Sequence, residues 1–71
     1  MQENPLKTDR SILTQRERQV LVHVAVGATN EEIADKLCIS PHTVKTHVYN
    51  ICKKVGATNR LQAALWAAKN L

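Results

Sequence analysis

Apolar residues recur at helical intervals in four segments of the chain, and each segment starts beside a residue that can cap a helix. The first has an apolar stripe made of Val20, Leu21, Val24 and Ala25. Thr14 and Glu17 form a TxxE capping box at its start, and Gly27 supplies a stop. The many valines would also permit a strand, but the capping box favours a helix.

Two further segments follow the same pattern. Thr29 and Glu32 form a second capping box, before a short helix whose buried stripe is Ile33, Ala34 and Leu37. Near the end of the chain, Asn59 can cap a helix through Gln62. The apolar residues of this last helix are Leu61, Ala63, Ala64, Leu65, Trp66, Ala67 and Ala68.

The stretch ISPHTVKTHVYNICKKV predicts the remaining helix, over residues 41–55. Ser40 caps free N–H groups, Pro41 needs no N–H at the first helical position, and Gly56 ends the helix. At 100° per residue, a narrow core stripe contains Val44, Val48, Ile51 and Val55. The opposite face carries His42, Lys45, Thr46, Tyr49, Asn50 and Lys53. The four predicted helices, with no convincing strand, indicate an all-α fold.

The outward face of helix 41–55 has no carboxylate, and its side chains can donate hydrogen bonds to base acceptors and phosphates. All six acids precede residue 36, so the first part of the chain carries 4 − 6 = −2 and the second part carries +6, with nothing to neutralise it. Such a one-sided basic field suits a polyanion such as nucleic acid. The alternative is that these lysines only keep the domain in solution.

The two cysteines, Cys38 and Cys52, form no CxxC pair, so a disulfide framework is not expected. Together with His42 and His47 they have spacings that a zinc site could use. His47 and Cys52 are five residues apart, however, and point to separate faces of a helix. We therefore predict buried small apolar cysteines, no metal and no cofactor.

No apolar run approaches the length of a membrane span, and the start of the chain lacks the regions of a signal peptide. A cytoplasmic location is expected. Residues 1–12 are predicted to form a flexible arm or linker, and residues 13–71 a single domain. Neither paired carboxylates nor a nucleophile, histidine and acid constellation indicates an enzyme.

The two central helices, 30–37 and 41–55, with the tight CIS connection between them, predict a helix-turn-helix. The segments LTQRERQVL, GATNEEIADKLCIS, PHTVKTHVYNICKKVGATNR and LQAALWAA resemble the four-helix DNA-binding domain of the LuxR/FixJ/NarL (GerE-like) class of bacterial transcription regulators. The resemblance covers residues 13–68. It implies that helix 41–55 enters the major groove of double-stranded DNA and that the last helix mediates dimerisation on a two-fold symmetric site. Many proteins of this class also carry an N-terminal receiver or ligand-binding domain.

By this resemblance, Lys45, Thr46 and Tyr49 would face base edges. The residues expected to hold the phosphate backbone are Thr43, His47, Asn50 and Lys53, helped by Asn30, Glu31 and Ser40. Two roles stay open. The Tyr49 phenol can contact a phosphate, a thymine methyl group or only water, and His47 can pack at the edge of its helix.

The last helix is apolar over most of its circumference, whereas a small monomer needs only one buried stripe. The resemblance assigns Ala63 and Ala67, with Ala64, to the core. The stripe of Leu61, Leu65 and Ala68 then remains for a homodimer. Alternatively, the arm or the first helix covers both stripes.

A second function stays open beside sequence-specific DNA binding. The chain can be a helical protein-interaction module that uses its last helix to bind another regulator or RNA polymerase. No small-molecule ligand is predicted for this domain.

Overall fold

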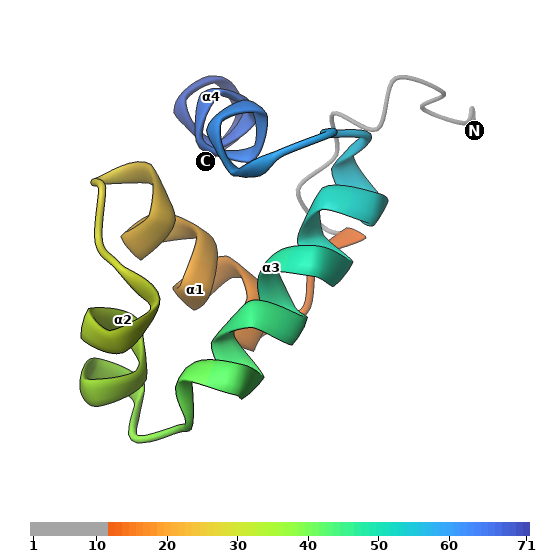
Figure 1. Cartoon of the computed structure of the whole chain (residues 1–71). Helices are drawn as coiled ribbons and strands as arrows, with labels where there is room; N and C mark the ends of the chain where they lie inside the picture. The colour runs from red at the N-terminus through yellow and green to blue at the C-terminus, as the bar shows by residue number, and fades with distance from the viewer. Residues whose placement is uncertain (1–11) are drawn as a thin grey trace.

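The computed structural model describes residues 12–71, and within them the chain folds into four helices and no strand. They are α1 (Gln15–Ala25), α2 (Asn30–Leu37), α3 (Pro41–Val55) and α4 (Arg60–Asn70) (Figure 1). The predicted all-α class is thus confirmed. The arm expected over residues 1–12 lies outside the described part except for Ile12, which is half-buried and packs against the core. The boundary between arm and domain stays a prediction.

Helix α3 lies at the centre of the arrangement, because each of the other three helices packs against it. Figure 1 shows α2 beside the first turns of α3 and α4 beyond the far end of α3. Helix α1 packs against both α3 and α4. The buried apolar residues form one core: Leu13, Val20, Leu21, Val24, Ile33, Ala34, Val44, Ile51, Val55, Ala63 and Ala67.

The helix starts are those that the capping residues predict. Thr14 Oγ1 accepts a hydrogen bond from the backbone N–H of Glu17 at 3.0 Å, and the Glu17 carboxylate accepts one from the N–H of Thr14 at 2.9 Å. The second capping box, Thr29 with Glu32, has both bonds as well. Side chains of Ser40 and Asn59 cap α3 and α4. These bonds satisfy N–H groups that have no partner within a helix.

The helix ends use left-handed residues. Gly27 (φ 89°) and Gly56 (φ 81°) follow α1 and α3, where only glycine adopts such angles without strain. After α2 the corresponding residue is Cys38, with φ 59°. This conformation lets the N–H of Ile39 donate to the carbonyl of Ala34 at 3.0 Å, so the chain turns at once toward α3.

Several burial predictions need correction. Cys38 is exposed rather than buried, because it lies in the turn beyond α2 and not in its apolar stripe. Cys52 is only half-buried; burial raises the pKa of its thiol, although the charge of Arg60 opposes this. Ala25 is exposed beside an open hollow between the end of α1 and the start of α4. Leu37 and Val48 are half-buried at the edge of the core.

Candidate nucleic-acid interface

The position of the α3 core stripe decides which side chains α3 turns outward. Val44, Ile51 and Val55 are buried, and the opposite face is open to solvent. Of the residues on this face, His42, Lys45, Thr46, Tyr49 and Lys53 are exposed and Asn50 is half-buried. Thr43 and His47 are half-buried on the flank between this face and the core stripe. The predicted contacts on this helix therefore lie on or beside an accessible, carboxylate-free ridge, which we call the α3 ridge.

The start of the α3 ridge is held by local hydrogen bonds. Ser40 Oγ accepts from the backbone N–H of Thr43 at 3.0 Å, and the two hydroxyl groups share a hydrogen bond of 2.9 Å. The hydroxyl of Thr46 donates to the carbonyl of His42 at 3.2 Å. These bonds fix the rotamers of three short polar side chains, and each hydroxyl oxygen keeps further lone pairs for a ligand.

Tyr49 and Lys53 form a pair on the α3 ridge. The Lys53 ammonium nitrogen lies 5.4 Å from the centre of the Tyr49 ring, within the range of a cation–π interaction. Tyr49 remains 63% exposed, so the pair leaves the phenol accessible. Sequence reasoning placed both residues on one face and did not predict the pair, although their spacing of four residues is the signal for it.

Lys54 pairs with a buried carboxylate and is not part of the α3 ridge. Its ammonium group contacts the Glu17 carboxylate at 2.8 Å, and Glu17 is only 5% exposed. Burial raises the pKa of this carboxyl group, but the hydrogen bonds from Lys54 and Thr14, with the charge of Lys54, together lower it below 4.5. The prediction that nothing neutralises the cations after residue 35 is therefore wrong for Lys54. The position of Glu17 on the same helix face as Val20, Leu21 and Val24 is the signal that was missed.

A second cation of the basic half, Arg60, also binds inside the domain. Its guanidinium donates to the side-chain carbonyl of Asn30 and to the backbone carbonyl of Ala28, each at 2.7 Å. Asn30, a predicted phosphate contact, is thus half-buried at the first position of α2. Its neighbour Glu31 is exposed. The carboxylate of Glu31 would repel a phosphate, so only its backbone N–H suits the predicted role.

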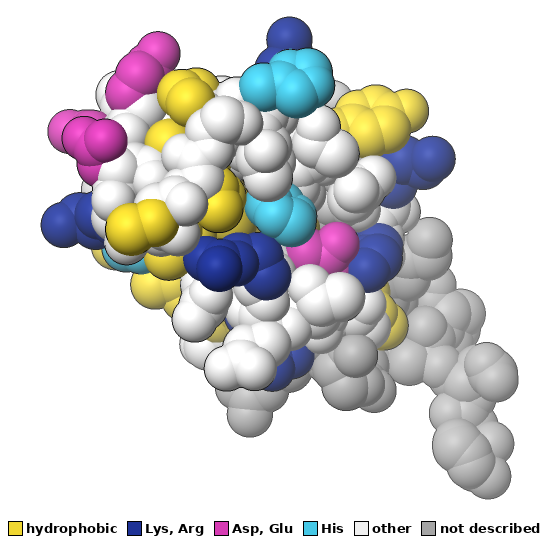
Figure 2. Space-filling model, turned by 90° about the horizontal axis from the view of Figure 1, so that it is seen from below, with side chains coloured by type: hydrophobic (Ala, Val, Ile, Leu, Met, Phe, Trp, Pro, Cys, Tyr) yellow, Lys and Arg dark blue, Asp and Glu magenta, His cyan; other side chains and the backbone are white. Residues whose placement is uncertain are grey.

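Figure 2 shows the charged side chains on one face of the molecule. Most of the acidic side chains in this view gather at the edge on the α2 side. Lysine, arginine and histidine side chains are spread over the rest of the face, where one further acidic side chain lies beside a basic one. The carboxylates of Glu31, Glu32 and Asp35, all in α2, are exposed. The charge is thus separated in space as well as along the sequence, and the cationic part contains the α3 ridge.

Helix α4 exposes an apolar stripe. Leu61 is 67% and Leu65 is 56% exposed, and Ala68 is exposed beside them. The opposite side carries the buried Ala63 and Ala67, which confirms their assignment to the core. The alternative that α1 covers both stripes is wrong, because more than half of the surface of Leu61 and of Leu65 is open to solvent. Cover by the arm involves residues outside the described part of the chain.

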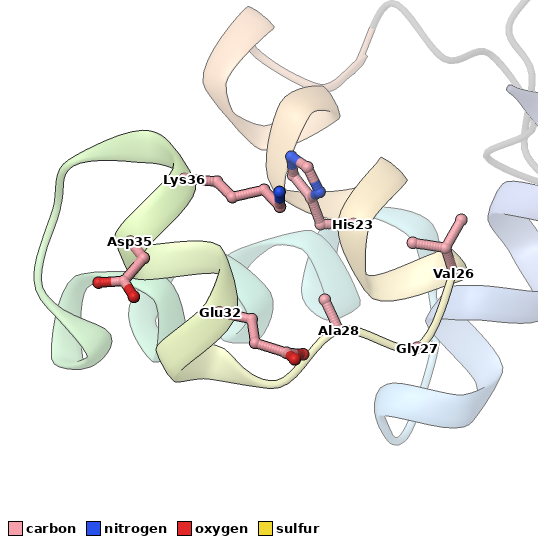
Figure 3. Close-up of a pocket in the computed structure, with 7 residues that line it drawn as sticks. All are labelled: His23, Val26, Gly27, Ala28, Glu32, Asp35 and Lys36. Carbon is pink, nitrogen blue, oxygen red and sulfur yellow. The ribbon is translucent and has the colours of Figure 1, made fainter.

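The hollow between the end of α1 and α2 combines a histidine with carboxylates. Its lining residues are His23, Val26, Gly27, Ala28, Glu32, Asp35 and Lys36 (Figure 3). In this view the Lys36 side chain reaches toward His23, and the Asp35 carboxylate points away from it. Within residues 12–71, no group of three His, Cys, Asp or Glu side chains could hold a metal ion.

In the described part of the chain, no helix is both long and apolar enough to cross a lipid bilayer. The α2–α3 unit, with its left-handed turn and exposed α3 ridge, defines a helix-turn-helix domain. The sequence matches the family of bacterial regulatory proteins called the luxR family over residues 11–67. The chain therefore belongs to this family of DNA-binding transcription regulators, as the sequence resemblance implies.

Named relatives support this assignment. The chain is 50% identical over 64 residues to the CsgBAC operon transcriptional regulatory protein of Escherichia coli. The matched residues make up 90% of this chain and 30% of the relative. The chain is 47% identical over 58 residues to the transcriptional regulatory protein LiaR of Bacillus subtilis, covering 82% and 28%. It is 45% identical over 56 residues to the response regulator protein VraR of Staphylococcus aureus, covering 79% and 27%. The chain thus spans less than a third of the length of these relatives.

Proposed function

We propose that this domain binds double-stranded DNA sequence-specifically as part of a transcription regulator, with α3 in the major groove. The observation that carries the proposal is the α3 ridge: exposed donor and cationic side chains with no carboxylate among them, on a helix capped at both ends. A major groove about 12 Å wide admits one α-helix. The domain is expected to act in the cytoplasm.

Within this proposal, Lys45, Thr46 and Tyr49 face the base edges, since they are the exposed members of the ridge near its middle. Lysine suits the acceptor atoms of guanine, and the threonine methyl group suits the methyl group of thymine. Thr43, His47, Asn50 and Lys53 flank them and hold phosphates. Ser40, Asn30 and the backbone of Glu31 add contacts from the turn and from α2.

The domain is further proposed to bind as a homodimer on a two-fold symmetric site, through Leu61, Leu65 and Ala68 of α4. Exposed leucines on a helix that already buries its other side favour a partner helix of the same kind. The same exposed leucines favour the second candidate function, a protein-interaction module that binds another regulator or RNA polymerase.

Selection of bound duplexes from a random pool tests the proposed function. We expect a motif with inverted half-sites, and binding whose logarithm falls steeply with the logarithm of salt concentration. Lys45→Ala is expected to weaken binding by about 1 to 3 kcal/mol and to relax one position of the motif. Equal weakening on all sequences would make Lys45 a phosphate contact. A wild-type protein that selects no duplex even at low salt would leave the interaction module as the better candidate.

A further inference from the structure

Arg60 joins the start of α4 to the start of α2. Its Nη1 donates to Asn30 Oδ1 at 2.7 Å and its Nη2 donates to the carbonyl of Ala28 at 2.7 Å. Arg60 and Asn30 are both half-buried, so water competes less for these bonds than at an open surface. One guanidinium thus binds a side-chain oxygen and a backbone oxygen that lie about thirty residues away in the sequence.

This contact decides which end of the Asn30 amide faces outward. A guanidinium has donors and no acceptor, so only the oxygen of the amide can face Arg60. The Nδ2 group then points away from Arg60, and among the described residues it has no hydrogen-bond acceptor. It lies at the first position of α2, where backbone N–H groups also point outward along the helix axis.

We propose that Arg60 is a positioning residue for DNA binding: it locks the Asn30 amide with its NH₂ group outward, as a donor to a DNA phosphate. This inference rests on the proposed function and deepens it. An unrestrained asparagine would present either its oxygen or its nitrogen, and only the nitrogen attracts a phosphate. Arg60 therefore acts through Asn30 without touching the nucleic acid.

Asn30→Asp is the sharpest test. Aspartate keeps an oxygen for Arg60 and adds a charge-assisted pair at a helix start, so the midpoint of urea unfolding should equal or exceed that of the wild type. The outward NH₂ group becomes a carboxylate oxygen, which repels phosphate. We expect DNA affinity to fall by at least about tenfold, since a hydrogen bond to a charged group is lost and a like charge is added. Gln19→Glu on α1 is the control for net charge and should cost about threefold or less.

A double-mutant cycle then assigns the effect to Arg60. Arg60→Met, which keeps the apolar stem, should weaken DNA binding about fivefold in the wild-type background and should have no further effect in Asn30→Ala, because the positioned group is then absent. The Asn30 side-chain ¹H–¹⁵N resonances report whether this NH₂ group meets DNA: they should shift on addition of duplex in the wild type. Arg60→Lys should restore part of the affinity, and it replaces Arg60→Met in the cycle if that variant does not fold.

The outcomes separate this inference from the proposed function. If wild-type protein binds duplexes but Asn30→Asp binds equally well, or Arg60→Met weakens binding equally in both backgrounds, Arg60 has no positioning role and the DNA-binding proposal stands. If the wild type binds no duplex, both fail.

Discussion

Lys53 and Lys54 are neighbours in the sequence, yet the fold gives them different tasks. Lys53 is exposed beside the Tyr49 ring, and Lys54 is held by the buried Glu17 carboxylate. An unpaired lysine can neutralise a DNA phosphate and so release a counterion condensed on the DNA, whereas a lysine already paired with a carboxylate does not. Net charge alone therefore overstates the electrostatic contact that this domain offers to a polyanion.

The two lysines provide a matched pair of variants. Lys53→Met should make the fall of log affinity with log salt concentration shallower by about 0.9, because one phosphate contact is lost. Lys54→Met should leave that slope unchanged and instead lower the free energy of unfolding. Titration of a labelled duplex at several salt concentrations, with urea unfolding of both variants, measures these effects. Equal slopes for the two variants would contradict the assignment.

Cys38 has a backbone conformation that favours glycine. At φ 59° an ordinary residue costs about 1 to 2 kcal/mol, and part of the relief in a glycine variant is offset by its greater freedom when unfolded. Cys38→Gly should therefore raise the free energy of unfolding by about 0.5 kcal/mol. Cys38→Ala, which keeps the Cβ atom, should change it little. Urea unfolding under reducing conditions distinguishes the two, and a gain in the alanine variant alone would implicate the thiol instead of the backbone.

At the scale of elements, the pair of Glu17 and Lys54 ties the start of α1 to the last turn of α3. Glu17 also closes the capping box of α1. One buried carboxylate thus fixes a helix start and orients the helix that carries the α3 ridge. Removing one partner of such a pair leaves the other charge without compensation, which costs more than the pair itself contributes.

Acid titration should reveal this pair. The pKa of Glu17 is lowered in the folded state, so its stabilising contribution is complete above its ordinary value of 4.5 and is lost as pH falls through the lower folded value. Glu17→Gln should be less stable by about 1 to 2 kcal/mol at pH 7, and the difference should shrink below about pH 4. Urea unfolding from pH 7 to pH 3 measures it. A difference that is the same at every pH would show that packing, not the charge, is responsible.

The helix boundaries were largely predictable because caps and stops are local signals. The residues Thr14, Thr29, Ser40 and Asn59 start the helices as predicted, and Gly27 and Gly56 follow two of the ends. The left-handed Cys38 was not predicted, since cysteine gives no such signal in the sequence. Its conformation follows from the need to pack α2 and α3 together over a short connection.

The long-range polar contacts could not be read from periodicity. The partners in the pair of Glu17 with Lys54 and in the pair of Asn30 with Arg60 come from different helices, and the distance between them depends on how those helices pack. The α3 ridge was predictable because it is the complement of a core stripe on one helix. The assignment of its residues to bases or to phosphates remains a prediction, which experiment can test.

At the scale of the whole molecule, α4 combines a packed side with an exposed apolar side. Leu65→Glu should abolish self-association and weaken binding to a two-half-site duplex by about tenfold or more, while binding to a single half-site changes little. Val22→Glu, which replaces an exposed valine on α1, is the control. Sedimentation and titration of both duplexes measure the effects. A Leu65→Glu protein with unchanged oligomer distribution and full affinity would contradict the dimer.

The central place of α3 limits how such a domain can be controlled. Since the other three helices all pack against α3, none of them can move as a switch without disturbing the α3 ridge. A signal that governs this domain is therefore expected to act from outside it, by covering α3 or by bringing two copies of the domain together.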